Sequence, residues 1–293
     1  MNALETTNPP AAATGLPPVD RSPLRRRRRV RILKQAAAVA ISLFMGVPVY
    51  LIGLAAFSTK DALNAFPKSF LPVDVSTGTI DSFLSSTGIG PAAVNSLMTG
   101  LLTVVLSLVI GAPAGYALAR FAFRGRDAYQ LVLLLTRALP IVVLSIPLAQ
   151  LFLSTGMYDT VTAVVLIHTA LALPTTVLIT SSIFVSVPRD VEEAALIFGC
   201  TRFGAFRQVV MPLAVPGLAA SSVFTFVLSW NEVLGAAITT LDHRTLPAQV
   251  LTSLQQSPLA YRFAGGFLLV VPALVFIALM RRYLLNMWGN GPR

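Results

Sequence analysis

The stretch that decides the fold is Ser186-Val-Pro-Arg-Asp-Val-Glu-Glu-Ala-Ala-Leu-Ile-Phe-Gly199, which continues through Thr201 and Arg202 to Pro212. It lies between two long apolar segments, at about residues 161–184 and 213–237. A helix needs about 20 mostly apolar residues to cross the hydrocarbon core of a bilayer. The polar stretch therefore has the position of a loop between two membrane spans.

The composition supports a membrane protein. Of the 293 residues, 55% are hydrophobic and 12% are charged, whereas soluble domains carry about 25% charged residues. The chain has one Cys and two His, which excludes an intrachain disulfide and leaves no metal-ligand spacing. We predict no metal site and no catalytic residue.

Six apolar runs reach spanning length. They cover about residues 35–57, 95–119, 129–151, 161–184, 213–237 and 263–284. The runs are too long for barrel strands and do not alternate with period two. Because backbone polar groups in lipid must bond internally, the sequence predicts an all-α membrane protein with six transmembrane helices. The first run exceeds the 7–15 residues of a signal-peptide core, so we expect it to remain a helix.

The basic residues predict the orientation. Most of the 22 Lys and Arg residues fall in the N-terminal segment, in the loops after the second and fourth runs, and in the tail, which places both termini and the 186–212 loop in the cytoplasm. The run Arg25–Arg29 is typical of an anchor to anionic lipid headgroups rather than of a nucleic-acid arm. We expect residues 1–34 to be a disordered basic cytoplasmic segment, 35–285 the membrane domain, and 286–293 a cytoplasmic tail.

The loop itself predicts two short helices. Ser186 is suited to capping the first helix and Pro188 to its first turn. An apolar stripe at helical spacing consists of Val191, Ala194, Ala195 and Phe198. Gly199 permits a left-handed C-terminal cap. A second helix, at about 201–210, is expected to end before Pro212.

The spacing of Glu193-Ala194-Ala195, Gly199 and Pro212 resembles the EAA loop of ABC-importer permeases. Val209 and Met211 stand where that family has Ile and Leu. The resemblance implies that a coupling helix around Gly199 docks into an ATPase made as a separate chain. The coupling residues that it implies are Glu193, Ala194, Ala195, Gly199, Thr201, Arg202 and Pro212.

Other segments are similar to the carbohydrate branch of these permeases, and most closely to the smaller permease of the maltose-type importer. These segments are Asn95-Ser96-Leu97, Tyr116 to Arg126, Leu139-Pro140, Ser229-Trp230-Asn231-Glu232 and Arg244 to Pro247. The resemblance implies the type I ABC importer permease fold in the bacterial cytoplasmic membrane, a sugar or sugar-derived solute, a second homologous permease, two ATPase copies and an extracytoplasmic solute-binding protein.

Two further expectations concern ligands and partners. The chain has no G-x-x-x-x-G-K-[ST] phosphate loop, so the resemblance assigns ATP and Mg to the ATPase and no cofactor to this chain. In the maltose-type subunit, the loop after the fifth span reaches into the binding protein. Gln255, Gln256 and Ser257 have the donors and acceptors for such a contact.

Polar groups inside the predicted spans are candidates for a solute path or a subunit interface. Arg137 would reach cytoplasmic water, pair with a carboxylate of the companion permease, or line the path. Asn231 and Glu232 lie toward the outer part of the fifth span, and Glu232 needs a partner or water there. His168 is interpreted as a hydrogen-bonded bundle residue or, less commonly, a solute ligand.

Two other classes of protein fit the sequence less well. A secondary transporter would show inverted repeats and several intramembrane acids, but Glu232 alone is found. An intramembrane enzyme lacks support, since there is no H-E-x-x-H motif. A neutral oligosaccharide, an anionic sugar derivative, a polyol and a polyamine all stay open as solutes.

Overall fold

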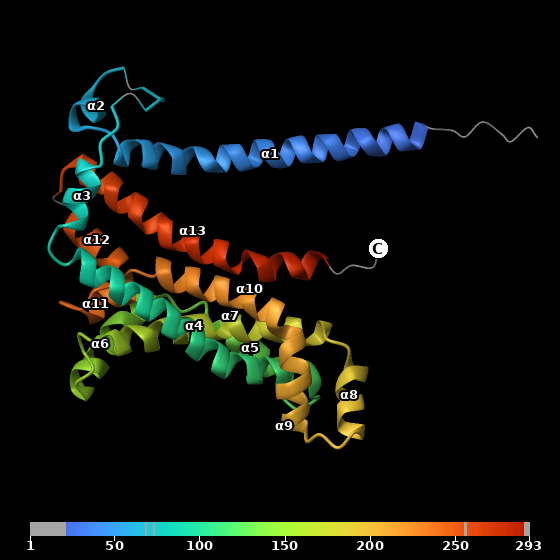
Figure 1. Cartoon of the computed structure of the whole chain (residues 1–293). Coiled ribbons are helices and arrows are strands. Elements are labelled where there is room, and N and C mark those ends of the chain that lie inside the picture. Colours follow the sequence, from blue (N-terminus) through green and yellow to red (C-terminus); the bar gives the residue numbers. More distant parts are fainter. Residues whose placement is uncertain (1–21, 68, 73, 255–256, 290–293) are drawn as a thin grey trace, which may run out of the picture. The chain divides into compact units, whose positions relative to one another are not determined.

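The computed structural model in Figure 1 describes residues 22–67, 69–72, 74–254 and 257–289. The secondary structure of this described part is helical, apart from an isolated bridge between Ser58 and Val75. Five helices are long and apolar enough to cross a membrane, and a bent pair of helices makes a sixth span if it is counted as one. This agrees with the predicted helical membrane fold. The chain divides into two units, residues 1–50 and 51–293, which are described separately.

The first unit contains most of helix α1 (Ser22–Ala56). The helix begins well before the predicted start at residue 35, so residues 22–34 are helical and the expectation of disorder there is wrong. Arg and Lys are good helix formers, and Pro23 falls in the first turn, where its missing N–H costs no hydrogen bond.

Three helices form the centre of the second unit: α4 (Ile89–Arg120), α7 (Val161–Ser186) and α10 (Met211–Asn231). Glycines at Gly111 and Gly115 let α4 approach α7 closely. A Cβ on Gly111 would lie 2.8 Å from Cγ2 of Thr176, and the hydroxyl of Thr180 donates to the carbonyl of Gly111 at 2.9 Å. The Gly-x-x-x-Gly spacing therefore serves packing inside this chain.

Helix α13 (Leu259–Gly289) packs on α10 through aromatic side chains. Phe226 stacks on Phe276 with ring centroids 4.0 Å apart, and the indole N–H of Trp230 donates to the carbonyl of Leu269. Because α13 runs to Gly289, residues 286–289, which were expected in the tail, continue this helix.

Two shorter helices pack against the first turns of α4. They are α3 (Gly78–Leu84) and α12 (Leu246–Leu254), and the short helix α2 (Lys60–Asn64) precedes α3 in the chain. Phe83 of α3 and Val250 of α12 share a buried cluster with Ile89, the first residue of α4. The loop after the fifth span, in which contacts to a binding protein are expected, thus contains a packed helix.

The third predicted span is not one continuous helix. It consists of α5 (Arg126–Thr136) and α6 (Ile141–Thr155), which meet at 89°. The break covers Arg137–Pro140, and Pro140 is extended, with ψ 133°. A proline disfavours the helical conformation of the residue before it, which ends α5 ahead of Pro140.

The fifth predicted span is also interrupted. Helix α10 ends at Asn231, Glu232 is extended with ψ 123°, and α11 (Leu234–Thr239) follows. Glu232, expected inside the span, therefore lies in the break between two helices.

The start of the fifth span differs from the prediction too. A short helix α9 (Arg202–Ala205) continues through a π-turn (Phe206–Val210) directly into α10. The expected end before Pro212 is wrong. In the π-turn, the N–H of Met211 donates to the carbonyl of Phe206, five residues back. This wider turn makes room for Pro212, which has no N–H to continue a regular helix.

Candidate functional site: the α8–α9 loop and the pocket at the helix breaks

The predicted coupling loop forms helix α8 (Arg189–Ile197), which is separated from α9 by four residues. Ser186 does not cap α8, contrary to expectation. It is the last residue of α7, and its hydroxyl donates back to the carbonyl of Ile183. The N-cap is Pro188 instead, and Asp190 and Glu192 lie in the first turn of α8, where carboxylates interact favourably with the free N–H groups of the helix.

Gly199 ends α8 as the sequence predicts, with φ at +91°. Its N–H donates to the carbonyl of Leu196, and the N–H of Cys200 donates to the carbonyl of Ala195, both at 3.0 Å. These two bonds define a Schellman cap, which favours glycine at the left-handed position. Thr201 then caps α9 by accepting the N–H of Gly204 at 3.1 Å. The chain reversal is thus fixed by local hydrogen bonds.

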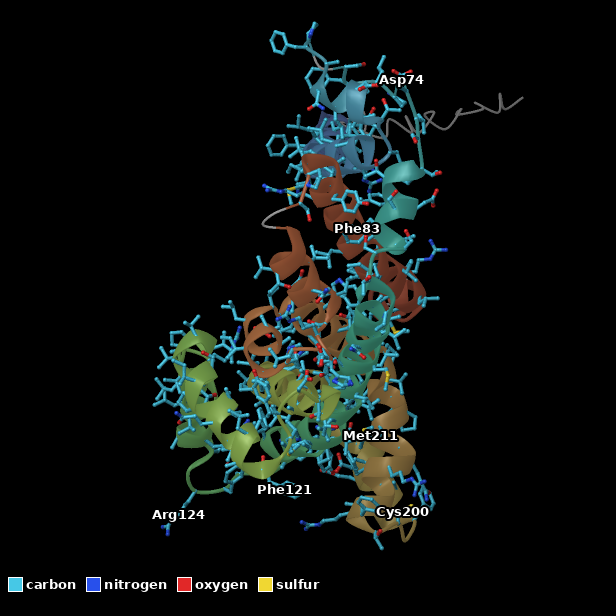
Figure 2. The ribbon with its side chains drawn as sticks, turned by 90° about the vertical axis from the view of Figure 1, so that its left-hand side faces the viewer. Asp74, Phe83, Phe121, Arg124, Cys200 and Met211 are labelled. Carbon is cyan, nitrogen blue, oxygen red and sulfur yellow. The ribbon has the colours of Figure 1, made fainter. Side chains whose placement is uncertain are left out.

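The loop exposes three large apolar side chains. Ile197 is 84% exposed, Phe198 88% and Phe203 70%. They flank Cys200, which Figure 2 shows at the end of the second unit where Phe121 and Arg124 also lie. Exposed groups of large apolar residues mark surfaces that bind another protein or the membrane.

The remaining predicted coupling residues surround this surface. Glu193 and Pro212 are exposed, while Ala194 and Ala195 are half-buried. The guanidinium of Arg202 lies 5.8 Å from the ring centroid of Phe121, within the range of a cation–π interaction. Arg202 therefore contacts the turn that follows α4.

The loop also has a largely buried attachment to α4 that was not predicted from the sequence. Arg120 Nε lies 2.7 Å from Oε2 of Glu192, and the two side chains are 6% and 12% exposed. The Tyr116 hydroxyl donates to Oε1 of Glu192. The acid beside the EAA pattern, rather than Glu193, thus binds the rest of the chain. Tyr116 and Arg120 lie four residues apart, on one face of the helix. This spacing was the signal in the sequence that both could bind the same group.

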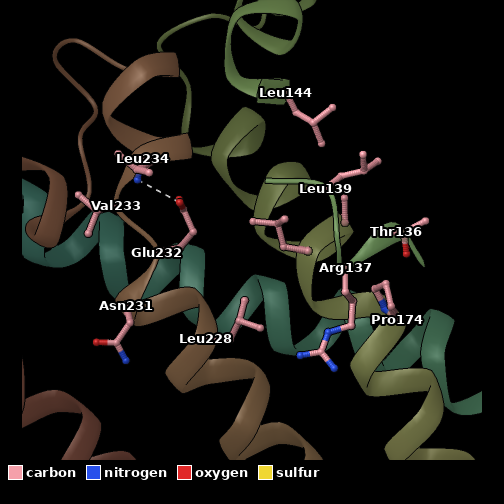
Figure 3. Close-up of a pocket in the computed structure, with 12 residues that line it drawn as sticks. Thr136, Arg137, Leu139, Leu144, Pro174, Leu228, Asn231, Glu232, Val233 and Leu234 are labelled. Carbon is pink, nitrogen blue, oxygen red and sulfur yellow. Dashed lines mark hydrogen bonds between the residues drawn. The ribbon is translucent and has the colours of Figure 1, made fainter. Parts of the chain in front are cut away.

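The second candidate region is a pocket of about 720 Å³ at the two helix breaks. Arg137 from the α5–α6 break, and Asn231 and Glu232 from the α10–α11 break, line it together with mostly apolar side chains (Figure 3). The side chain of Arg137 has no hydrogen bond or ion pair with any described residue. The pocket therefore presents a guanidinium that no described residue binds, in a lining that is mostly apolar but includes Asn231 and Glu232.

Glu232 is bound on several sides. Its carboxylate accepts the N–H groups of Leu234 and Gly235, each at 3.0 Å, and Oε2 lies 3.0 Å from Nε2 of His168. The Nδ1 atom of His168 lies 2.8 Å from the Ser229 hydroxyl. Because His168 is completely buried and both ring nitrogens are engaged, it has the arrangement of a hydrogen-bonded bundle residue.

The segment after α11 is fixed by hydrogen bonds near both of its ends. Oδ1 of Asp159 accepts the N–H groups of Leu241, Asp242 and His243 at 2.8–3.0 Å. At the other end, the hydroxyl of Ser96 accepts a hydrogen bond from the N–H of Leu246. Farther along, the carbonyl of Ser257 accepts from Arg262. Gln255 and Gln256, the other predicted contacts for a binding protein, lie outside the described residues.

The fold and these sites define a multi-pass helical membrane protein with an exposed loop between two spans. Residues 107–285 match the family described as binding-protein-dependent transport system inner membrane component. The match covers more than half of the chain, and the chain belongs to this family. It is a permease of an ABC importer in the bacterial inner membrane.

Two curated relatives illustrate the similarity. The diacetylchitobiose uptake system permease protein DasC of Streptomyces coelicolor is 31% identical over 83% of this chain and 90% of its own length. The trehalose transport system permease protein SugB of Mycobacterium tuberculosis is 33% identical over 65% of this chain and 72% of its own length.

A solved structure supports the fold. A chain of a bacterial ABC transporter involved in the import of the acidic polysaccharide alginate aligns with a TM-score of 0.68 at 21% identity, covering 89% of this chain and 98% of that chain. The type I importer permease fold expected from the sequence is therefore confirmed.

Proposed function

We propose that this permease carries a sugar or a sugar-derived solute, and that a separate ATPase drives it by binding the α8–α9 loop. The observation that carries the ATPase part is the exposed apolar group of Ile197, Phe198 and Phe203 on a loop fixed by Gly199. Burying one such side chain contributes about 1.5–3 kcal/mol. A complementary groove on a partner would thus gain substantial affinity from the three together.

The residues around Ile197, Phe198 and Phe203 have the charge and the small size that suit contact with a protein partner. Glu193 is exposed next to the apolar side chains and is available to a basic group of the ATPase. Ala194 and Ala195 present little bulk, which allows a close approach. Thr201 and Arg202 fix the start of α9 on the far side of Gly199. ATP and Mg would be bound by the ATPase, since this chain has no phosphate loop.

The sugar part is supported by relatives whose names specify trehalose, diacetylchitobiose and arabinooligosaccharides. The pocket at the helix breaks has the volume of a small-molecule site, which is typically about 300–1,000 Å³. Arg137 and Asn231 supply polar groups at its wall. We propose that this wall lines the solute path where the chain meets a second, homologous permease.

A binding protein is the fourth proposed component. The segment between α11 and α13 lies after the fifth span, on the side that the charge distribution places outside. Gln255, Gln256 and Ser257 are its proposed contacts. Asp159 and Ser96 would hold the first part of this segment in place for docking.

The first test is to purify the tagged chain from its native membrane in mild detergent and to identify the proteins that accompany it. An ATPase together with a second permease would support the proposal. If the chain emerges alone and solute uptake persists without any ATPase, the proposed coupling is wrong.

The second test uses Gly199. In proteoliposomes containing the whole importer, Gly199→Val should allow ATP hydrolysis without solute uptake, because a β-branched residue resists the left-handed conformation. Gly199→Asn is the matched control, since asparagine tolerates that conformation, and it should transport nearly normally. Normal uptake by Gly199→Val would contradict the role of the loop. Both variants should insert into the membrane at wild-type levels.

A further inference from the structure

The carboxylate of Glu192 joins the coupling loop to the end of a spanning helix. Arg120 Nε lies 2.7 Å from Glu192 Oε2, and the Tyr116 hydroxyl donates to Glu192 Oε1. Tyr116 and Arg120 are one turn apart near the C-terminal end of α4. A single side chain of α8 thus binds two residues of α4.

Two backbone contacts reinforce this attachment. Arg120 also donates through Nη2 to the carbonyl of Val187, in the turn before α8, at 2.9 Å. In return, Arg189 at the start of α8 donates to the carbonyl of Ala119 at 3.4 Å. The end of α4 and the beginning of α8 are therefore bound to each other in both directions.

The ring of Tyr116 extends the connection to two more elements. Its centroid lies 5.7 Å from that of Phe184 on α7 and 4.5 Å from that of Phe206 in the π-turn. Aromatic pairs at such distances attract each other beyond the effect of their buried area. Tyr116 thus contacts α7 and the π-turn while its hydroxyl binds α8.

The burial of the ion pair decides how firmly these parts are joined. An exposed ion pair contributes little to stability and could break and reform as the loop moves. The side chains of Arg120 and Glu192 are only 6% and 12% exposed. Separating a pair that is largely shielded from water is costly, because each charge is left without its partner. The loop would therefore move together with the end of α4.

We propose that Glu192 is a positioning residue that makes α8 and the end of α4 one moving body, so that a displacement of the loop reaches the helix bundle through α4. This inference rests on the proposed function, in which the ATPase binds the loop. From α4, the movement would pass to α7 through the close contact at Gly111 and Gly115.

Another acid of the same helix provides a matched control. Asp190 has the same charge and lies on α8, but it is exposed and has no hydrogen bond or ion pair with any described residue. If Glu192 acts by binding α4, neutralising Glu192 and neutralising Asp190 will have different consequences. Asp190→Asn should not alter the attachment of α8 to α4.

The first experiment measures solute molecules imported per ATP hydrolysed by the complete importer in proteoliposomes. We expect Glu192→Gln to lower this ratio about tenfold while the ATPase still co-purifies. Tyr116→Phe, which keeps the aromatic ring, should lower it by a smaller factor. Asp190→Asn should leave the ratio unchanged. Wild-type ratios in both Glu192→Gln and Tyr116→Phe would overturn the inference.

The second experiment tests the moving body directly, even if Glu192→Gln folds poorly. Spin labels are placed at Val105 on α4 and Val191 on α8, both exposed, in a Cys200→Ser background. In the otherwise wild-type importer, the distance between the labels should be the same without nucleotide and with ATP trapped. A change of several ångströms between these states would overturn the inference. Failure of the ATPase to co-purify with the wild-type chain would instead refute the proposed function.

Discussion

The hydroxyl of Thr180 on α7 donates to the carbonyl of Gly111 on α4 across 2.9 Å. Such a bond requires the two backbones to approach each other, because the threonine side chain is short. The approach is possible since neither Gly111 nor Gly115 has a Cβ on the facing surface. In a bilayer, where helices gain no hydrophobic free energy by associating, close packing and hydrogen bonds of this kind hold the bundle together.

The first prediction concerns Gly115. A Cβ there would lie 2.7 Å from the backbone N of Ser181, and a backbone atom cannot rotate away as a side chain can. Gly115→Ala should therefore lower the stability of the protein by about 1–3 kcal/mol, measured as the denaturation midpoint in detergent. Gly90→Ala, in the same helix with nothing within 4 Å, should be neutral or stabilising. Equal midpoints for the two variants would contradict the proposed contact.

The second prediction concerns His168. Replacing it by Phe keeps the ring but removes both nitrogens, so the Ser229 hydroxyl and the Glu232 carboxylate each lose a partner. A buried polar group left without its partner costs about 1–3 kcal/mol. His168→Phe should therefore lower the denaturation midpoint, whereas His243→Phe, at a side chain that is 58% exposed, should leave it nearly unchanged. The reverse order would show that the histidine contacts do not stabilise the bundle.

Local features of the loop could be predicted from the sequence. The left-handed turn at Gly199 follows from a glycine placed directly after an apolar stripe, and its cap forms between neighbouring residues. The approximate positions of the spans were predictable for a similar reason, since the length of an apolar run shows whether it can cross a bilayer. Five runs correspond to apolar helices of spanning length, and the remaining run corresponds to the bent pair α5 and α6.

The helix breaks and the buried contacts could not be predicted in the same way. Hydropathy averages over a span, so it does not show that Glu232 leaves the helix to accept N–H groups from the next one. The choice between Glu192 and Glu193 depends on where α4 lies, and the partners of Glu192 are more than 70 residues away in the sequence. Such contacts depend on packing between helices rather than on local pattern.

The third prediction concerns the apolar surface of the loop. Phe198→Ala should weaken binding of the ATPase, since truncating a large apolar anchor at an interface costs about 2 kcal/mol. The denaturation midpoint of the chain alone should not change, because Phe198 is 88% exposed. Phe184→Ala is the contrasting variant. Its side chain is fully buried, so the free energy of unfolding should fall by about 3–5 kcal/mol. The denaturation midpoint should fall with it. Unchanged ATPase binding by Phe198→Ala would exclude this surface as the docking site.

The last prediction is a pH dependence centred on Asp159. Burial raises the pKa of this carboxyl. The N–H groups of His243, Leu241 and Asp242 lower the pKa by more than burial raises it, so the pKa lies below the ordinary value of 3.8. The unfolded chain thus binds a proton at a higher pH than the folded chain does. The resulting stabilisation is complete above pH 3.8 and is lost as the pH falls through the folded-state pKa.

Asp159→Asn separates charge from geometry. Its amide oxygen is able to accept the same N–H groups, and asparagine tolerates the left-handed conformation that Asp159 adopts, with φ at 59°. Between about pH 5 and pH 3, the denaturation midpoint of the wild type should fall more than that of Asp159→Asn. Asp159→Ala should be less stable than both at neutral pH, because the N–H groups of Leu241, Asp242 and His243 lose their acceptor. Parallel curves for the wild type and Asp159→Asn would show that the charge of Asp159 does not stabilise the segment after α11.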